Sequence, residues 1–241
     1  MTTGTLFGIG VGPGDPELIP LKAVRILGEV DLVFTAASTK NDYSLAVEIV
    51  RAHIPEQTPI EKLDFPMSKD HTVMEAAWRR HAERIAEALS DGKKAAFLTL
   101  GDPLTYSTFG YVVRHLKTGW PGINIQTVPG ITSYQAAAAA LNQPLMEGEE
   151  SLMVMSGVHG GERLLEMSKA PENVVFLKAY RNVDGICHAL SQTGLAQGSV
   201  AVSNCSREDQ KIYPDLCSLE DQKPNYWTLI IAKRNGHVSQ T

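Results

Sequence analysis

The apolar residues of this chain fall into short runs separated by stretches with helical spacing. In the first half, apolar runs predict five strands, at residues 6–11, 31–36, 60–65, 95–100 and 123–128. Apolar residues three or four positions apart predict helices at 21–27, 44–52 and 72–91, and another at 136–141. Strands that alternate with helices are typical of parallel βαβ units, so we expect the strand ends along one edge of a sheet.

Two of these helices have more specific features. The buried face of the first is predicted from apolar residues three positions apart: Leu21, Val24 and Leu27. In the longest helix, Thr72 and Glu75 form a capping-box pattern that predicts its start. His81 lies on the apolar stripe of that helix, which favours a packed histidine over a metal ligand.

The second half has more strands and shorter helices. Strands are predicted at 152–156, 174–179, 200–204, 211–213 and 226–232, and helices at 164–167 and 186–191. This pattern indicates a mixed sheet. We therefore predict two α/β domains with a boundary near Gly130: a mainly parallel N-terminal domain at 1–129 and a mixed-sheet C-terminal domain at 130–241.

Composition and charge narrow the class of protein. The 241 residues are 43% hydrophobic, enough for packed cores, and a net charge of −5 argues against a nucleic-acid-binding protein. The three cysteines form no C-x-x-C pair, which predicts reduced thiols. Apolar runs are shorter than the roughly 20 residues of a membrane span, and no leader peptide is predicted. We expect a cytoplasmic protein without a membrane or nucleic-acid partner and without a metal site.

The first predicted strand ends in a glycine cluster, GIGVGPGDP at 8–16. The cluster does not match the dinucleotide fingerprint G-x-G-x-x-G, because the sixth position counted from Gly8 is Pro13 and from Gly10 is Asp15. No phosphate-binding G-x-x-x-x-G-K-[ST] loop occurs. Two interpretations stay open: a tight turn in which Asp15 and Pro16 begin a helix, or backbone held close to a ligand.

Two more predicted strands end in polar loops. The loop at 100–108 brings together a carboxylate, two hydroxyls and a phenol, from Asp102, Thr105, Ser107 and Tyr106. The loop at 129–133 contains Thr132 and Ser133. Because ligands of open parallel sheets bind beyond the carboxyl ends of the strands, the three loops predict one site. The alternative is that Asp102 only shapes its loop, and that the third loop only caps the next helix.

Together the three loops resemble a known family. In order and spacing, GIGVGPGDPELIPLKA, LTLGDPLTYSTFG and VPGITSYQAAAAAL are similar to the signatures of the tetrapyrrole (corrin/porphyrin) methylases. The later stretches NVVFLKAYRN, SVAVSN and NYWTLIIAKR match later strands of that family, so the resemblance covers almost the whole chain. It implies a homodimeric S-adenosylmethionine-dependent methyltransferase with two α/β domains, a cofactor cleft between them and a tetrapyrrole substrate.

Other stretches narrow the resemblance. GDPLTYSTFGYV, DYSLAVEIV, DFPMSKD and PLMEGEESLMVMSG are most similar to members that methylate C20 of precorrin-2 or cobalt-factor II, and the choice between metal-free and cobalt-bound substrate stays open. Pro20 stands where the family usually has Thr, and Cys205 where some relatives have Gly. Alternatives are methylation at another ring position or of a non-tetrapyrrole substrate, and a sensor that binds the cofactor without turnover.

The resemblance also implies roles for individual residues. Positions that match the family's cofactor site, or lie beside it, are Pro13, Leu100, Gly101, Asp102, Thr105, Tyr106, Ser107, Thr132, Ser133, Lys178 and Cys205. Asp102 is the predicted catalytic base, because the methylated meso carbon must lose its proton. Cations expected to hold the substrate's carboxylate arms, unless they are only solvated charges, are Arg79, Arg80, Arg181 and Lys211.

Overall fold

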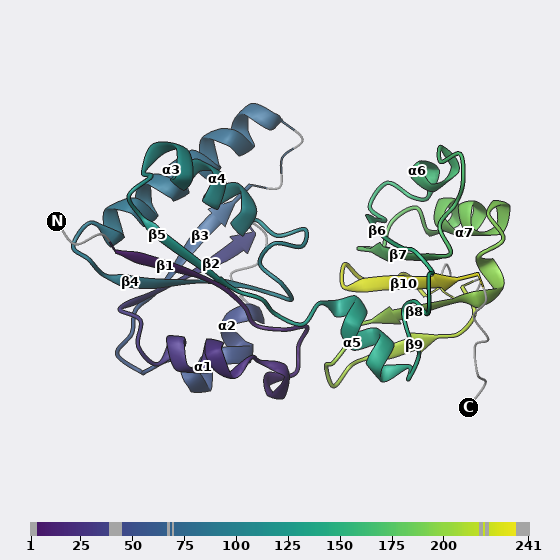
Figure 1. Ribbon diagram of the computed structural model, residues 1–241, viewed down its shortest axis with the longest axis horizontal. Helices are drawn as coiled ribbons and strands as arrows, with labels where there is room; N and C mark the ends of the chain where they lie inside the picture. Colours follow the sequence, from purple (N-terminus) through teal and green to yellow (C-terminus); the bar gives the residue numbers. More distant parts are fainter. Residues whose placement is uncertain are drawn as a thin grey trace. The chain divides into compact units, whose positions relative to one another are not determined.

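The structure is a computed structural model that describes residues 4–38, 45–66, 68, 70–216, 219 and 222–234. The chain divides into two compact units, Met1–Thr132 (unit 1) and Ser133–Thr241 (unit 2). Each contains one five-stranded sheet (Figure 1). The division falls after Thr132. The sequence pattern predicts a boundary slightly earlier, after residue 129.

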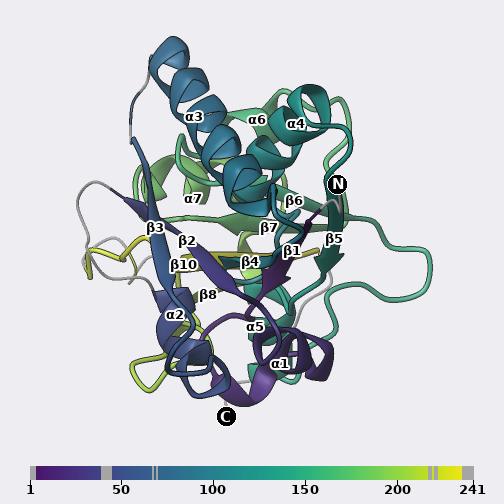
Figure 2. The same ribbon diagram turned by 90° about the vertical axis from the view of Figure 1, so that its left-hand side faces the viewer.

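Unit 1 is a parallel sheet between two layers of helices, as predicted. Its strand order is β3-β2-β4-β1-β5, and every strand pair is parallel. The strands are β1 Thr5–Gly10, β2 Leu32–Ser38, β3 Ile60–Phe65, β4 Lys94–Thr99 and β5 Asn124–Val128. Figure 2 shows helices on both faces of this sheet. One face has α3 (His71–Leu89) and α4 (Phe109–Gly119), and the other has α1 (Leu21–Leu27) and α2 (Leu45–Val50).

Alternate residues of the strands supply two separate core layers. Phe34 and Phe97 pack in a cluster with side chains of α3 and α4, such as Ile85. Their neighbours Val33 and Leu98 pack in another cluster with side chains of α1 and α2. Because successive side chains of a strand point to opposite faces and both faces are covered, these strands are continuous apolar runs in the sequence.

The structure corrects three helix predictions in unit 1. Leu27 is buried, but Leu21 is 87% exposed, and α1 buries Ala23 and Ile26 with Leu27; three apolar residues do not fix the phase of a helix of 7 residues. Helix α3 begins earlier than predicted, because Asp70 caps it by accepting a hydrogen bond from the Thr72 amide at 2.8 Å. Helix α4 was not predicted at all, although its buried residues have helical spacing: Phe109, Val112 and Leu116.

Unit 2 contains a mixed sheet, also as predicted. Its strand order is β6-β7-β10-β8-β9, with β6 and β7 parallel and the other pairs antiparallel. The strands are β6 Leu152–Ser156, β7 Asn173–Leu177, β8 Ser199–Ser203, β9 Lys211–Tyr213 and β10 Thr228–Lys233. The helices are α5 Ser133–Ala140, α6 Glu162–Leu165 and α7 Val183–Gln192. Phe176, Ile186 and Ile230 lie in the core between the sheet and α7.

The topology of this mixed sheet gathers several loops at one edge. Because β10 is antiparallel to both β7 and β8, those two strands end where β10 begins. The residues after β7 and β8 therefore lie at the same edge as the residues before β10. Lys211, at the start of β9, faces Ser203 at the end of β8 and joins this edge.

The remaining sequence predictions concern single residues. His81 is a packed residue, as predicted: it is buried, its Nε2 lies 2.7 Å from the Asp64 carbonyl oxygen, and its ring contacts Phe65. Cys187 and Cys205 form no disulfide bond within the described residues, and Cys217 lies outside them. Within the described part of the chain, no helix is long and apolar enough to cross a membrane.

Candidate functional site

Three loops meet at the carboxyl ends of three neighbouring strands of unit 1, β4, β1 and the edge strand β5. The first loop (11–16) follows β1, the second (100–108) follows β4 and the third (129–132) follows β5. Gly12 and Gly101 form a two-way backbone bridge, in which the Gly101 amide donates to the Gly12 carbonyl at 2.7 Å and the Gly12 amide donates back at 3.3 Å. The first and second of the three predicted loops are therefore joined directly by backbone hydrogen bonds.

Glycines allow this convergence because backbone packs directly on backbone. A Cβ on Gly130 would lie 2.1 Å from the Gly101 carbonyl oxygen, and a Cβ on Gly10 would lie 2.6 Å from the Gly130 nitrogen. Neither position accepts a side chain without moving a loop. Of the two interpretations of the glycine cluster, the tight turn is present, since Asp15 caps a short 3-10 helix at Pro16–Leu18. The glycines also have a role that neither interpretation included, which is contact between loops.

Asp102 ties the second loop together and joins it to the third. Its Oδ1 accepts hydrogen bonds from the Leu104 amide at 2.9 Å and the Thr105 hydroxyl at 3.2 Å. Its Oδ2 accepts one from the Gly130 amide at 3.2 Å. Both carboxylate oxygens are thus engaged in loop contacts, which favours the alternative in which Asp102 shapes the site. The catalytic role stays a prediction.

The other polar groups of the second loop are partly used inside the loop. The Ser107 hydroxyl accepts a hydrogen bond from the Phe109 amide at 3.2 Å, at the start of α4. Leu104 and Tyr106 protrude instead, with 63% and 50% of their surface exposed. The Tyr106 backbone has a φ of 49°, a left-handed conformation that costs an ordinary residue roughly 1–3 kcal/mol. Strain at an exposed aromatic residue beside a strand end indicates a binding function.

The other predicted residues of unit 1 lie in two places. Pro13 and Thr132 are buried and Leu100 is half-buried, all within the three loops, whereas Ser133 is the first residue of α5 in unit 2. Arg79 and Arg80 are exposed on α3, roughly 12 Å along the helix from its first residue at a rise of 1.5 Å per residue. Arg79 pairs with Glu83 at 3.8 Å on the same helix. This ion pair lies within α3, so it does not join Arg79 to the three loops.

The other four predicted residues lie at the strand edge of unit 2. Lys178 and Arg181 follow β7, Cys205 follows β8, and Lys211 begins β9. Cys205 is only 4% exposed, and burial raises the pKa of its thiol, so this side chain is a neutral packing group at pH 7. Lys178 has a φ of 59°, a strained conformation for a lysine.

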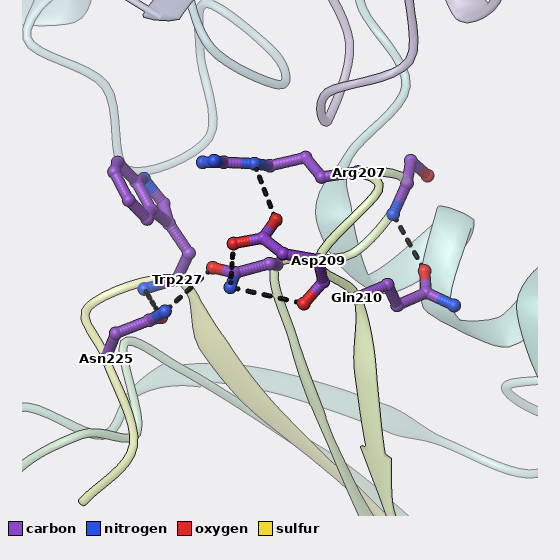
Figure 3. Close-up of polar contacts among 7 residues, drawn as sticks. Arg207, Asp209, Gln210, Asn225 and Trp227 are labelled. Carbon is purple, nitrogen blue, oxygen red and sulfur yellow. Dashed lines mark hydrogen bonds and ion pairs between the residues drawn. The ribbon is translucent and has the colours of Figure 1, made fainter.

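Sequence reasoning missed a polar network at this edge (Figure 3). The Arg207 guanidinium lies 5.0 Å from the centre of the Trp227 ring, and its Nε pairs with Asp209 at 3.1 Å. The Asn204 amide donates to Asp209 at 2.8 Å and its oxygen accepts from Asn225 at 2.8 Å. In the sequence, Arg207 stands in a polar stretch and Trp227 in a predicted strand, and neither position indicates a site. The one available signal was the presence of cationic and aromatic residue types near predicted strand ends.

Aromatic and cationic residues continue along the edge as one row. Tyr226 lies between Tyr180 and Trp227, with ring centres 5.5 Å and 6.4 Å away. The Lys178 ammonium is 5.4 Å from the Tyr226 ring centre, and the Arg181 guanidinium is 4.9 Å from that of Tyr180. We call this set the basic–aromatic row: Lys178, Tyr180, Arg181, Arg207, Tyr226 and Trp227. Among the described residues, no three His, Cys, Asp or Glu side chains form a group able to hold a metal ion.

Comparison with known proteins gives consistent matches. The sequence model of the tetrapyrrole (corrin/porphyrin) methylases matches residues 5–220. A cobalt-precorrin-2 C(20)-methyltransferase of Salmonella typhimurium is 32% identical over 238 residues, which cover 98% of this chain and 99% of that protein. A probable cobalt-precorrin-2 C(20)-methyltransferase of Methanocaldococcus jannaschii is 41% identical over 150 residues, covering 62% of this chain and 63% of that protein.

A solved structure agrees in fold. The uroporphyrin-III C-methyltransferase of Thermus thermophilus, complexed with S-adenyl homocysteine, has a TM-score of 0.67 and 26% sequence identity. The match covers 98% of each chain. The two-unit α/β architecture is therefore shared along nearly the full length.

Proposed function

Because the chain belongs to the tetrapyrrole (corrin/porphyrin) methylases, we propose that it is an S-adenosylmethionine-dependent methyltransferase that methylates C20 of precorrin-2 in cobalamin biosynthesis. The observation that carries this proposal is the full-length match at 32% identity to a relative of that name. Both relatives described above are named for the cobalt form of the substrate, which favours cobalt-precorrin-2 (cobalt-factor II) over the metal-free compound.

The three loops of unit 1 fit the proposed cofactor. Gly101 has a φ of 69°, and a Cβ built on it would meet only the Ile131 carbonyl oxygen, 3.9 Å away. Open space therefore lies beyond this glycine, beside the loop backbone. Pro13, Leu100, Gly101, Thr105 and Thr132 surround the strand ends there, and we assign them, with Asp102, Tyr106, Ser107 and Ser133, to cofactor binding.

Methyl transfer to carbon depends mainly on positioning. S-adenosylmethionine, when bound, supplies a methyl group on a sulfonium for in-line transfer to a nucleophilic carbon. The rigid loops hold the reactants in place, and such positioning can lower a barrier by roughly 7–11 kcal/mol. Asp102 fixes the cofactor loops through its bonds to Thr105 and Gly130. To act as the base, the Asp102 carboxylate would also need to release at least one of these hydrogen bonds, because it must reach the proton on C20.

Methylation assays test the function directly. The protein is incubated under anaerobic conditions with isotopically labelled S-adenosylmethionine and with metal-free or cobalt-bound precorrin-2, and NMR locates the label. We expect the label on C20, with faster turnover of the cobalt form. Label at another ring position would support the alternative of a methyltransferase that acts at that position. Cofactor binding without transfer to any tetrapyrrole would select the sensor.

Assembly and location complete the proposal. We infer that the protein is a cytoplasmic homodimer, from its resemblance to the family. Light scattering at micromolar concentration should give about twice the single-chain mass of 26.2 kDa. A mass of one chain would contradict the homodimer while leaving the proposed reaction intact.

A further inference from the structure

Two of the three cations in the basic–aromatic row, Lys178 and Arg181, make no ion pair with a described residue. Among the residues that the structure describes, Lys178 and Arg181 contact aromatic rings and no carboxylate. Arg207 has one carboxylate partner, Asp209, reached through Nε. Figure 3 shows the rest of the Arg207 guanidinium extending past Asp209 toward Trp227. Of the three cations of the row, only Arg207 is therefore paired with a carboxylate among the described residues.

The polypeptide holds this charged edge in a fixed and strained shape. Ser206 and Lys178 have φ values of 63° and 59°, in the left-handed region that ordinary residues avoid, and Asn204, a residue that tolerates this region, has 52°. Hydrogen bonds maintain the shape, including those from the Ser206 amide to the Gln210 side chain at 2.8 Å and from the Trp227 amide to Asn225 at 3.0 Å. The loops at the edge of a sheet need neither left-handed backbone at ordinary residues nor exposed aromatic side chains. Strain that is maintained by such a network indicates a ligand site.

We propose that the basic–aromatic row binds the carboxylate arms of the tetrapyrrole, with Arg207 as the main contact. The proposal rests on the proposed function, because it takes the substrate class from there. A guanidinium binds a carboxylate through two parallel N–H bonds, and its cationic form is permanent at neutral pH. The rings of Tyr180, Tyr226 and Trp227 hold the cations by cation–π contact and offer apolar surface to a macrocycle.

This assignment separates substrate binding from cofactor binding by chemistry. S-adenosylmethionine has one carboxylate, whereas the tetrapyrrole has several acetate and propionate arms. A row of three cations from the loops after β7 and β8 matches the ligand with many carboxylates. Neutralising one cation should therefore weaken binding of a polycarboxylate and reduce its salt dependence, because fewer charge pairs remain to be screened.

The variant Arg207→Gln tests the proposal in the full chain. Calorimetry measures the affinity for uroporphyrin, a stable macrocycle with eight carboxylates, and for S-adenosylhomocysteine, each at low and at high salt. We expect uroporphyrin to bind about 10- to 100-fold more weakly, as for loss of a hydrogen-bonded charge, and S-adenosylhomocysteine to bind as in the wild type. The variant Arg207→Lys should recover part of the affinity.

A matched control exists in unit 1. Arg114 lies 5.7 Å from the ring centre of Tyr111, a cation–π pair on α4 outside the loops. Arg114→Gln should leave both affinities unchanged. If Arg207→Gln does not fold, Arg181→Gln replaces it, since Arg181 is exposed and makes no described hydrogen bond. For Arg181→Gln we expect a loss of several-fold.

Each outcome has a distinct meaning. Unchanged uroporphyrin affinity in both row variants would overturn the proposal, although the methyltransferase function would stand. Equal loss of uroporphyrin and S-adenosylhomocysteine would assign the row to the cofactor and also overturn it. If the wild-type protein binds neither compound and transfers no methyl group, the proposed function itself fails, and the assignment of the row fails with it.

Discussion

The two strand edges of this protein are built in opposite ways. At the edge of unit 1, backbone meets backbone: glycines bring three loops into contact, and the oxygens of Asp102 accept hydrogen bonds from those same loops. At the edge of unit 2, long side chains face outward, with cations over the exposed rings of Tyr226 and Trp227. The first edge presents shape and backbone groups, and the second presents charge and aromatic surface.

This difference matches the two ligands of the proposed reaction. A cofactor of fixed structure is best recognised by a rigid backbone cradle, because few side chains then need to be ordered on binding. A macrocycle with several flexible carboxylate arms needs separate cations along an edge. Changes at the two edges should therefore affect different ligands, and the following predictions test that separation.

The largest effect is expected at the contact between loops of unit 1. Gly130→Ala places a methyl group 2.1 Å from the Gly101 carbonyl oxygen, so the loops must separate. We expect loss of measurable S-adenosylhomocysteine binding and a loss of ~1–3 kcal/mol in the stability of unit 1, as for overpacking. Calorimetry and denaturant unfolding measure both quantities.

Gly110 supplies the matched control for this change. It lies in α4, and no atom comes within 4 Å of a Cβ built there. Gly110→Ala should leave cofactor binding unchanged and stabilise the protein by about 0.4–1 kcal/mol. Normal S-adenosylhomocysteine binding by Gly130→Ala would show that the close packing of the loops does not form the cofactor cradle.

The next largest effect concerns Asp102. In Asp102→Asn, an amide nitrogen would face either the Gly130 amide or the donors of the second loop, so one hydrogen bond is lost. We expect S-adenosylhomocysteine affinity to fall by about 10-fold, with kcat/KM falling in proportion. The opposite pattern, unchanged affinity with a rate reduced by ~10²–10⁴-fold, would establish Asp102 as the base. Asp15→Asn is the control, because asparagine caps a helix as well as aspartate does.

A smaller effect, a gain in stability instead of a loss, is expected at unit 2. Lys178→Asn removes the ammonium and places a residue that tolerates the left-handed backbone at a φ of 59°. We expect the protein to gain roughly 0.5–1 kcal/mol in stability from reduced strain, while uroporphyrin binding weakens. Lys178→Gln removes the same charge without relieving strain, so it should weaken binding with no gain in stability. A gain in stability from both variants would show that the strain does not come from this residue's backbone.

How much of the fold is predictable from the sequence depends on local pattern. Strands β3, β6 and β9 have the predicted bounds, because each is a short run between polar residues or turn residues. Helix α4 was not predicted, although Phe109, Val112 and Leu116 have helical spacing; it directly follows the polar loop at 100–108, and no side-chain cap marks its start. Asp70 was missed as a cap because Thr72 and Glu75 offered a competing pattern nearby.

The site was predictable only where it is formed by continuous motifs. The loops at Gly101 and Gly130 stand out in the sequence, although the contact between them depends on the strand order β4-β1-β5. The partners Arg207 and Trp227 are 20 positions apart and become neighbours because β10 pairs with β8. Non-local pairing of this kind leaves no mark on a single sequence.

The smallest effect tests whether the two units respond separately to acid. Burial holds the pKa of His81 below its usual value of 6.5, and within unit 1 its Nε2 contacts the Asp64 carbonyl oxygen. In the unfolded chain His81 binds a proton below about pH 6.5, whereas in the folded chain it stays neutral to lower pH, so unfolding takes up a proton and becomes easier in acid. The stabilising difference is fully present above pH 6.5 and is lost as the pH falls through the window below it.

Denaturant unfolding at pH 7.5 and 5.5 should show a loss of stability in unit 1, and His81→Phe should reduce that loss. With Trp78 and Trp120 of unit 1 replaced by phenylalanine, the fluorescence of Trp227 in unit 2 should report the same unfolding midpoint at both pH values. A shift of that signal together with the unit 1 transition would show that the two units unfold as one, and the two edges could then not be treated as independent.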